Sequence, residues 1–242
     1  DQLRGNVSGR IGYENSDKTD IALSLRGHSS EWDAAGYISA EQVEDEELRT
    51  EQAANAEHDG GAKEFYSQRI ALNHNFSDSL RMLVFGYAVQ QDFTRFAKFG
   101  FTPGGQTERF NTRNVYAAGA NLNGRSALAG IGVNWIFGAE YYSESTDRMR
   151  WQSNNRIRGD LFLDRQFDVQ TASVFGQGEF NVSRFLRLSV GLRYDQYFGS
   201  FTNSAPDITE FTLDMSTLSN LSPKIGIRST IAEGLDLRAS VS

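Results

Sequence analysis

The sequence contains few residues whose types and spacing could perform catalysis. None of its three histidines, His28, His58 and His74, belongs to a Gly-x-Ser-x-Gly element of the kind that presents a nucleophilic serine. His74 is expected on a strand beside a turn and His58 in an acidic segment, so both are interpreted as ordinary polar positions. The chain contains no cysteine, which excludes thiolate nucleophiles, thiolate metal sites and disulfides together. We therefore predict a protein that is not an enzyme, with no catalytic residues, no metal site and no cofactor.

Carboxylates are abundant and suggest two kinds of site. Glu140, Glu179 and Asp195 lie on the polar sides of alternating segments, where a glycosidase-type pair remains open. We interpret them instead as hydrated charges that face a water-filled interior. The segment 30–63 is also strongly acidic, but it lacks the Asp-x-Asp-x-Asp-Gly spacing of a calcium loop. It is interpreted as a solvated loop, with capture of Ca²⁺ or of a charged ligand as the alternative; its carboxylates are Glu41, Glu44, Asp45, Glu46, Glu47, Glu51, Glu57 and Asp59.

Two other segments combine arginines with aromatic rings. Residues 93–99 with Arg109 form one, and residues 148–151 with Arg156 and Arg158 form the other. Guanidinium groups bind anions through charge-assisted hydrogen bonds, and rings add stacking. The alternative is packing within loops and contact with anionic lipopolysaccharide. The candidate ligand-binding residues are Trp32, Tyr37, Arg95, Arg109 and Trp151.

Composition excludes two broad classes of protein. The chain has 242 residues, with 24 Lys and Arg against 31 Asp and Glu, and a formal net charge of −7. A nucleic-acid-binding protein needs a clustered basic surface, so no nucleic-acid partner is expected. No run approaches the roughly 18 apolar residues that a membrane-spanning helix requires. The chain opens on the polar Asp1-Gln2-Leu3-Arg4 without a signal peptide, which we interpret as a mature or internal piece of a longer protein.

Alternation of apolar and polar residues runs through most of the chain and predicts strands. The clearest example is 186–198, in which Leu188, Val190 and Leu192 share one face while Arg187 and Arg193 occupy the other. Segment 80–91 is interpreted in the same way, with Leu83, Phe85, Tyr87 and Val89 on the apolar face. The ten predicted strands are 6–13, 19–29, 64–76, 80–91, 110–122, 127–142, 168–181, 186–198, 222–230 and 235–242.

The connections between these strands alternate between short and long. Short turns are predicted at 14–18, 77–79, 123–126, 182–184 and 232–234, and Asn123-Gly124 is a strong hairpin signal. Long connections are predicted at 30–63, 92–109, 143–167 and 199–221. Outer-membrane barrels have short turns at one end and long loops at the other, and their strands exceed the usual length of globular strands.

The predicted fold class is therefore all-β, an antiparallel up-and-down transmembrane β-barrel. Aromatic residues near the ends of segments would form the girdle at a membrane interface. They are Tyr66, Tyr87, Tyr116, Trp135, Tyr141 and Tyr194. A β-sandwich core is the alternative for these rings, but a sandwich has no need of charged residues along the whole opposite face.

Two stretches near the carboxyl end resemble the barrels of TonB-dependent outer-membrane receptors. They are ASVFGQGEFNVSRFLRLSVGLRYDQYF, from Ala172, and LSPKIGIRSTIAEGLDLRASVS, from Leu221. The resemblance is strongest from Ala172 to Ser242 and extends weakly over nearly the whole chain. It implies a barrel of about 22 strands around a plug domain. Residues 1–242 would then be about ten consecutive strands of that barrel, without the plug or the other strands.

The resemblance also implies the function and the partners. The intact protein would bind and import a scarce nutrient, most often a ferric siderophore in this family, with energy delivered by the TonB complex through the missing plug. Lipopolysaccharide and lipid of the bacterial outer membrane would surround it. Two other functions remain open, a passive porin or adhesin barrel and a soluble carbohydrate-binding β-sandwich.

Overall fold

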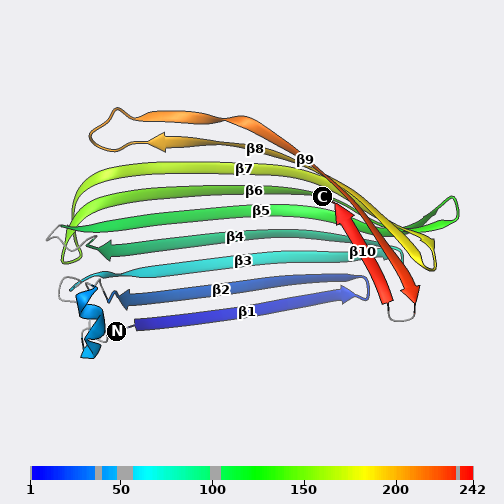
Figure 1. Cartoon of the computed structure of the whole chain (residues 1–242), viewed down its shortest axis with the longest axis horizontal. Helices are drawn as coiled ribbons and strands as arrows, with labels where there is room; N and C mark the ends of the chain where they lie inside the picture. The colour runs from blue at the N-terminus through cyan, green and yellow to red at the C-terminus, as the bar shows by residue number, and fades with distance from the viewer. Residues whose placement is uncertain (1, 36–39, 48–56, 99–104, 233–234, 242) are drawn as a thin grey trace.

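The computed structural model describes residues 2–35, 40–47, 57–98, 105–232 and 235–241. Within them, ten antiparallel strands form one sheet in which each strand pairs with the next in sequence. Figure 1 shows them side by side in chain order. The predicted up-and-down arrangement is confirmed. The strands are β1 (Gln2–Ser16), β2 (Thr19–Asp33), β3 (Gly60–Ser77), β4 (Leu80–Ala97), β5 (Gln106–Leu128), β6 (Ile131–Asn154), β7 (Ile157–Ser183), β8 (Leu186–Asn203), β9 (Phe211–Ala232) and β10 (Leu235–Val241).

The connection from β2 to β3 contains a short 3-10 helix, η1 (Glu41–Glu44). Figure 1 shows this helix at the end of the sheet where β2 ends and β3 begins. None of the helical segments in the described ranges is long and apolar enough to cross a membrane.

One face of the sheet is apolar and uncovered. Val190 and Leu192 are each 50% exposed, and their partners on β9, Ile225 and Pro223, lie beside them. Because each described strand pairs only within this sheet, the apolar side chains have no second layer of protein to pack against. This arrangement rules out the two-layer β-sandwich and leaves the apolar face for lipid. We call this side of the sheet the apolar face and the opposite side the polar face.

The apolar face has the height of a membrane core. On β6 it runs from Ile131 through Trp135 and Phe137 to Tyr141. Ten steps of about 3.4 Å span roughly 34 Å along the strand, or about 24 Å along the membrane normal at a 45° tilt. The apolar band of outer-membrane barrels is about 25 Å tall. The remainder of β6, up to Asn154, therefore extends beyond the bilayer.

The prediction for the faces of β4 was wrong. Phe85 pairs with Ala71 on β3 and Gly119 on β5, which places it on the polar face, whereas Val84 lies on the apolar face and is 39% exposed. Residues 82–85 are all apolar, so alternation could not choose between the two faces. The neighbouring strands decide, because Phe85 covers Gly119 and the Arg69 guanidinium lies 5.8 Å from its ring centroid. Leu83, Tyr87 and Val89 share the polar face with Phe85.

The hairpin predicted at Asn123-Gly124 was also wrong. Both residues lie inside β5, opposite Ile136 and Trp135, and the turn is formed by Ala129 and Gly130, both with positive φ. Gly124 allows the Trp135 ring to pack closely against the strand and does not form a turn. A Cβ atom there would lie 2.1 Å from the Trp135 ring.

Long strands replace much of the predicted loop structure. The segment 143–167 is not a loop, because β6 continues to Asn154 and a two-residue turn leads into β7. Connections of several residues remain at 34–59, 98–105 and 204–210, and we call this edge the loop end. The opposite edge carries two-residue turns at 17–18, 78–79, 129–130 and 184–185. Strand pairing continues through most of the extensions, so most of their backbone groups are hydrogen-bonded beyond the membrane.

The contact between Trp135 and Gly124 gives a test of strand register. Gly124→Ala should lower the free energy of unfolding of the intact protein by roughly 1–3 kcal/mol, because the added methyl group forces the indole ring to move. Urea unfolding in detergent micelles measures this effect. Gly86→Ala is the matched control, since a Cβ atom there meets its nearest neighbour at an ordinary 3.6 Å. Equal effects of the two substitutions would contradict the register.

Candidate ligand-binding site

A row of basic side chains crosses the polar face at the loop end. Residues directly opposite one another on successive strands share a face, and one such row contains Trp32, Gly61, Arg95, Arg109 and Arg150 on β2 to β6. The three arginines are therefore nearest neighbours across β4, β5 and β6. Arg109 lies an even number of residues from Gly119, which places the whole row on the polar face with Phe85.

A second row adds more cations two residues deeper. It contains Arg4, Ser30, Lys63, Phe93, Asn111, Arg148 and Arg165 on β1 to β7. No described residue of either row carries a carboxylate. We name the cations of the two rows the basic patch: Arg4, Lys63, Arg95, Arg109, Arg148, Arg150 and Arg165.

Aromatic rings lie among these cations. The rings of Trp32 and Phe93 are 5.9 Å apart, and Trp32 also covers Gly61, where a Cβ atom would lie 2.7 Å from the indole. The Arg148 guanidinium lies 6.0 Å from the Phe167 ring centroid. The patch thus offers an anionic ligand both charge and flat apolar surface.

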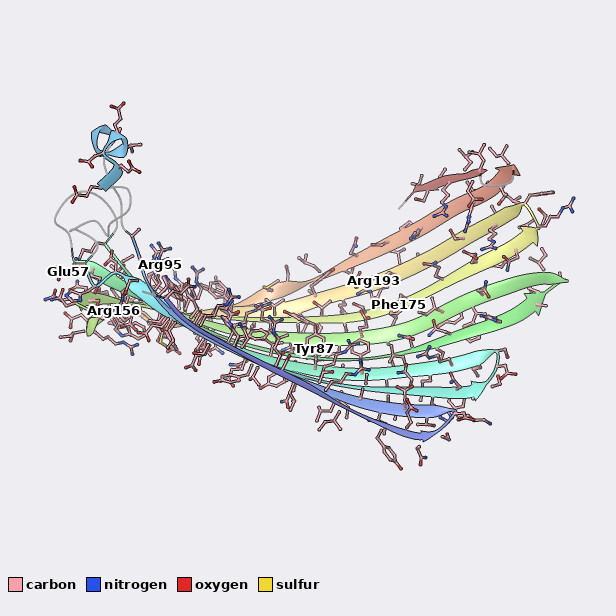
Figure 2. All side chains as sticks on the ribbon, turned by 90° about the horizontal axis from the view of Figure 1, so that it is seen from below. Glu57, Tyr87, Arg95, Arg156, Phe175 and Arg193 are labelled. Atoms are coloured by element: carbon pink, nitrogen blue, oxygen red, sulfur yellow. The ribbon has the colours of Figure 1, made fainter. Side chains whose placement is uncertain are left out.

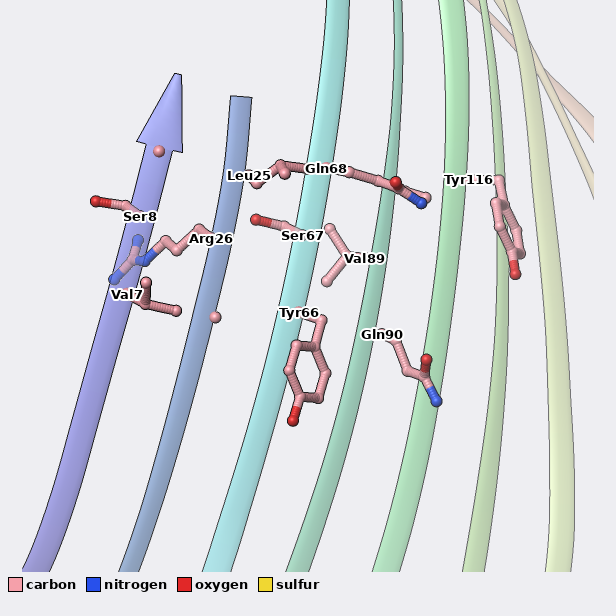
Figure 3. A pocket seen from close by; sticks show the side chains of 13 residues that line it. Val7, Ser8, Leu25, Arg26, Tyr66, Ser67, Gln68, Val89, Gln90 and Tyr116 are labelled. Carbon is pink, nitrogen blue, oxygen red and sulfur yellow. The ribbon is translucent and has the colours of Figure 1, made fainter. Parts of the chain in front are cut away.

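Two arginines closer to the other end of the polar face, Arg113 and Arg193, have carboxylate partners. Arg113 donates to Glu144 at 2.7 Å. Arg193 donates to Asp195 at 2.8 Å and to Glu140 at 3.3 Å. Figure 2 shows Arg193 with Phe175 in the middle of the sheet, far from Arg95.

Glu179 is a further polar-face carboxylate with a cationic neighbour, because Arg187 lies 3.6 Å from it. The predicted interior carboxylates Glu140, Glu179 and Asp195 are therefore partners of arginines.

At the loop end, level with the basic patch, the apolar side of the sheet carries negative charge. Glu64 lies opposite Asp92 on β3 and β4, and Asp147 follows across Thr112 on the next two strands. Asp164 and Asp168 lie on the same face of β7. The loop end is therefore basic on the polar face and acidic on the other.

The structure brings together only part of the predicted site. Trp32, Arg95 and Arg109 share one row. Trp151 lies on the opposite face and is 9% exposed, and Tyr37 lies outside the described residues. Strand alternation separates Arg150 from Trp151, and the same rule could have identified Arg148 and Arg150 as one face. Lys63, Arg165 and Arg4 were not singled out, because only pairing reveals that they are neighbours.

Trp151 belongs to a local ion-pair cluster. The Arg158 guanidinium lies 3.8 Å from the Trp151 ring centroid and donates to Glu108 with its Nε at 2.9 Å. The hydrogen bonds with Glu108 raise the pKa of the Arg158 guanidinium. This cluster keeps Arg158 occupied on the apolar side of the sheet.

Two of the three histidines lie beside polar side chains of the neighbouring strand. Nδ1 of His74 is 2.7 Å from the Thr19 hydroxyl, and Nδ1 of His28 is 2.8 Å from Oδ1 of Asn6. In the described part of the chain, no three His, Asp or Glu side chains are grouped to hold a metal ion.

Comparison with known proteins places the chain in a family. The family model "TonB dependent receptor-like, beta-barrel" matches residues 5–242, so the chain belongs to the TonB-dependent receptor barrel family of the bacterial outer membrane. No curated protein matches the sequence. The family and the solved relatives below are receptors and transporters, not enzymes.

Solved structures share the fold at low identity. The ferric citrate transporter FecA superposes with a TM-score of 0.79 at 12% identity, over 99% of this chain and 35% of FecA. The siderophore receptor PiuA from Acinetobacter baumannii gives 0.74 at 13% identity, over 96% of this chain and 40% of PiuA. BauA, the ferric preacinetobactin receptor of the same organism, gives 0.74 at 11%, over 99% and 39%. The chain thus spans less than half the length of these proteins.

Removing one charge should change the free energy of unfolding in opposite directions at Arg150, which lies opposite another arginine, and at Glu144, which pairs with Arg113. Arg150→Gln should raise the free energy of unfolding of the intact protein by about 0.5 kcal/mol at low salt, because it removes a like charge opposite Arg109. Glu144→Gln should lower it by about 1 kcal/mol, because it leaves Arg113 without its carboxylate. Urea unfolding at low and high salt measures both effects. A destabilised Arg150→Gln protein at low salt would show that the row is not self-repelling.

Proposed function

We propose that the chain is part of the barrel of an active outer-membrane transporter that binds and imports an anionic ferric chelate of the siderophore type. Residues 1–242 supply about ten of its strands, and the plug and remaining strands lie outside this sequence. Family membership supports the transporter class, and the basic patch supports an anionic cargo. The patch is the single observation on which the choice of cargo depends.

Electrostatics explain why such a site favours an anion. Like charges on neighbouring strands repel one another, and a multiply charged ligand replaces that repulsion with attraction. In the proposed barrel, protein walls rather than bulk water surround the patch, and they focus the field toward the mouth of the barrel. The acidic apolar side repels the same ligand, so the anion is directed to the polar face. Neutral cargoes such as oligosaccharides gain nothing from this arrangement.

The uncovered surfaces of the sheet support the proposed surroundings. Lipid can cover the apolar face, but it cannot satisfy backbone groups at the free edges of β1 and β10. These edges pair with further strands in the proposed barrel. Lipopolysaccharide surrounds the strand extensions, and TonB acts through the plug that fills the interior.

Binding and uptake of a radioactive ferric chelate test the proposed cargo. In cells that produce the complete receptor, the double variant Arg95→Gln/Arg109→Gln should weaken binding of the imported ferric chelate by about tenfold to a hundredfold, as expected for lost charge-assisted bonds. The loss should shrink as salt increases. Arg187→Gln is the matched control, because Arg187 is paired with Glu179 at the other end of the polar face. Unchanged affinity in the double variant would contradict an anionic cargo at this site.

The energy source is tested separately. Uptake by the wild-type receptor should stop in cells that lack TonB, whereas a passive porin would continue to conduct. TonB-independent uptake would therefore contradict active transport and favour a porin.

A further inference from the structure

A buried glutamine joins two connections at the loop end. Gln106, at the start of β5, is 2% exposed, and its Nε2 donates to the His58 carbonyl at 3.0 Å and to Oδ1 of Asp59 at 2.8 Å. Its Oε1 accepts from the Ser153 hydroxyl at 2.9 Å and from the Arg156 backbone N–H at 2.8 Å. All the polar groups of this amide are satisfied. The glutamine therefore fastens the end of connection 34–59 to the turn between β6 and β7.

Arg156 extends these contacts to three more strands, β2, β3 and β4. Both residues of its turn, Asn155 and Arg156, have positive φ, at 50° and 65°. The Arg156 side chain reaches the end of connection 34–59, where Nε donates to the His58 carbonyl at 2.9 Å and Nη2 donates to the Asp59 carbonyl at 3.1 Å. Nη2 also donates to Asp33, the last residue of β2, at 2.6 Å. Figure 2 shows Arg156 at the same end of the sheet as Arg95.

Two further contacts fix the path of this guanidinium. It lies 5.9 Å from the Phe96 ring centroid, at the end of β4. Gly60 has a φ of 154°, and a Cβ atom there would lie 2.5 Å from Nη2 of Arg156. Only glycine leaves room for the arginine at this position.

Each residue that Arg156 contacts on β2, β3 and β4 is adjacent in sequence to a residue of the first row, which contains Trp32, Gly61 and Arg95. Asp33 follows Trp32, Gly60 precedes Gly61, and Phe96 follows Arg95. Asp33, Gly60 and Phe96 are themselves directly opposite one another. Successive side chains of a strand point to opposite faces. Arg156 therefore contacts these strand ends on the face opposite to the one on which they present Trp32 and Arg95.

We infer that Arg156 is a positioning residue for anion binding and acts through Trp32, Gly61 and Arg95. The inference rests on the proposed function. The strand ends that carry Trp32, Gly61 and Arg95 lie beyond the membrane, where no lipid keeps them from separating. The bonds of Arg156 oppose that separation before a ligand arrives. Such preorganisation increases affinity by reducing the ordering that binding would otherwise require.

Arg158 provides a matched control from the same region. It lies two residues after Arg156 and has the same charge, but it pairs with Glu108 and stacks on Trp151, which are cross-strand neighbours on β5 and β6. Removing it leaves β2, β3 and β4 untouched.

A ligand-free distance measurement tests the positioning. The chain has no cysteine, so spin labels can be placed at Ser29→Cys on β2 and Gln166→Cys on β7 in the complete receptor. These positions belong to one row, five strand steps or about 24 Å apart. Arg156→Gln should at least double the width of the distance distribution measured by pulsed electron paramagnetic resonance. Arg158→Gln should leave the width unchanged, and Arg156→Lys should broaden the distribution less than Arg156→Gln does.

Ligand affinity then tests the consequence of positioning. The probe is whichever of ferric citrate, a ferric catecholate or a ferric hydroxamate the wild-type receptor binds most tightly. Arg156→Gln should weaken its binding about tenfold, and Arg158→Gln less than twofold. In an Arg95→Gln background the same change should reduce affinity by a smaller factor, because part of the effect of Arg156 is transmitted through Arg95. A purely structural defect would reduce affinity equally in both backgrounds.

The outcomes separate this inference from the proposed function. If the wild type binds a chelate and Arg156→Gln binds it equally well, the positioning role is overturned and the transporter proposal stands. If the wild type binds none of the chelates, the proposed function fails. Should Arg156→Gln not assemble, Asp33→Asn replaces it and should give a smaller change in the same direction. Unchanged width and affinity in Asp33→Asn would then overturn the positioning role.

Discussion

The register of strand pairing is the constraint on which the rest of this structure depends. Lipid offers no hydrogen bonds, so each strand must pair its backbone with its neighbours over the whole crossing. Pairing in a fixed register also decides which face each side chain occupies, because a slip of one residue reverses both faces. The uncovered apolar face, the ion pairs of Arg193 and the arginine row all follow from it.

Separation of charge at the loop end is the main functional consequence of that register. A chain with a net charge of −7 places Arg95, Arg109 and Arg150 next to one another on its polar face. At the same height, Glu64 and Asp92 lie on the reverse side. Strands that continue beyond the membrane make this possible, because pairing keeps alternation intact. Flexible loops of the same composition would not separate the two signs.

The sequence predicted the fold well and the site only in part, for identifiable reasons. Alternation in residues 186–198 is unambiguous and assigned both faces correctly, whereas four consecutive apolar residues at 82–85 allowed Phe85 to be placed on the wrong face. Asn123-Gly124 has the chemistry of a turn, but Trp135 needs that glycine for packing. The neighbours of Arg109 across strands depend on register, which a single sequence does not contain.

Solvent accessibility along β8 tests the central claim most directly. Single spin labels at successive positions from Leu188 to Arg193, in the complete receptor in bilayers, report contact with oxygen in lipid or with a nickel chelate in water. The two-faced sheet predicts maximal oxygen contact at positions 188, 190 and 192 and maximal nickel contact at positions 189, 191 and 193. Uniform accessibility, or the reverse alternation, would contradict it.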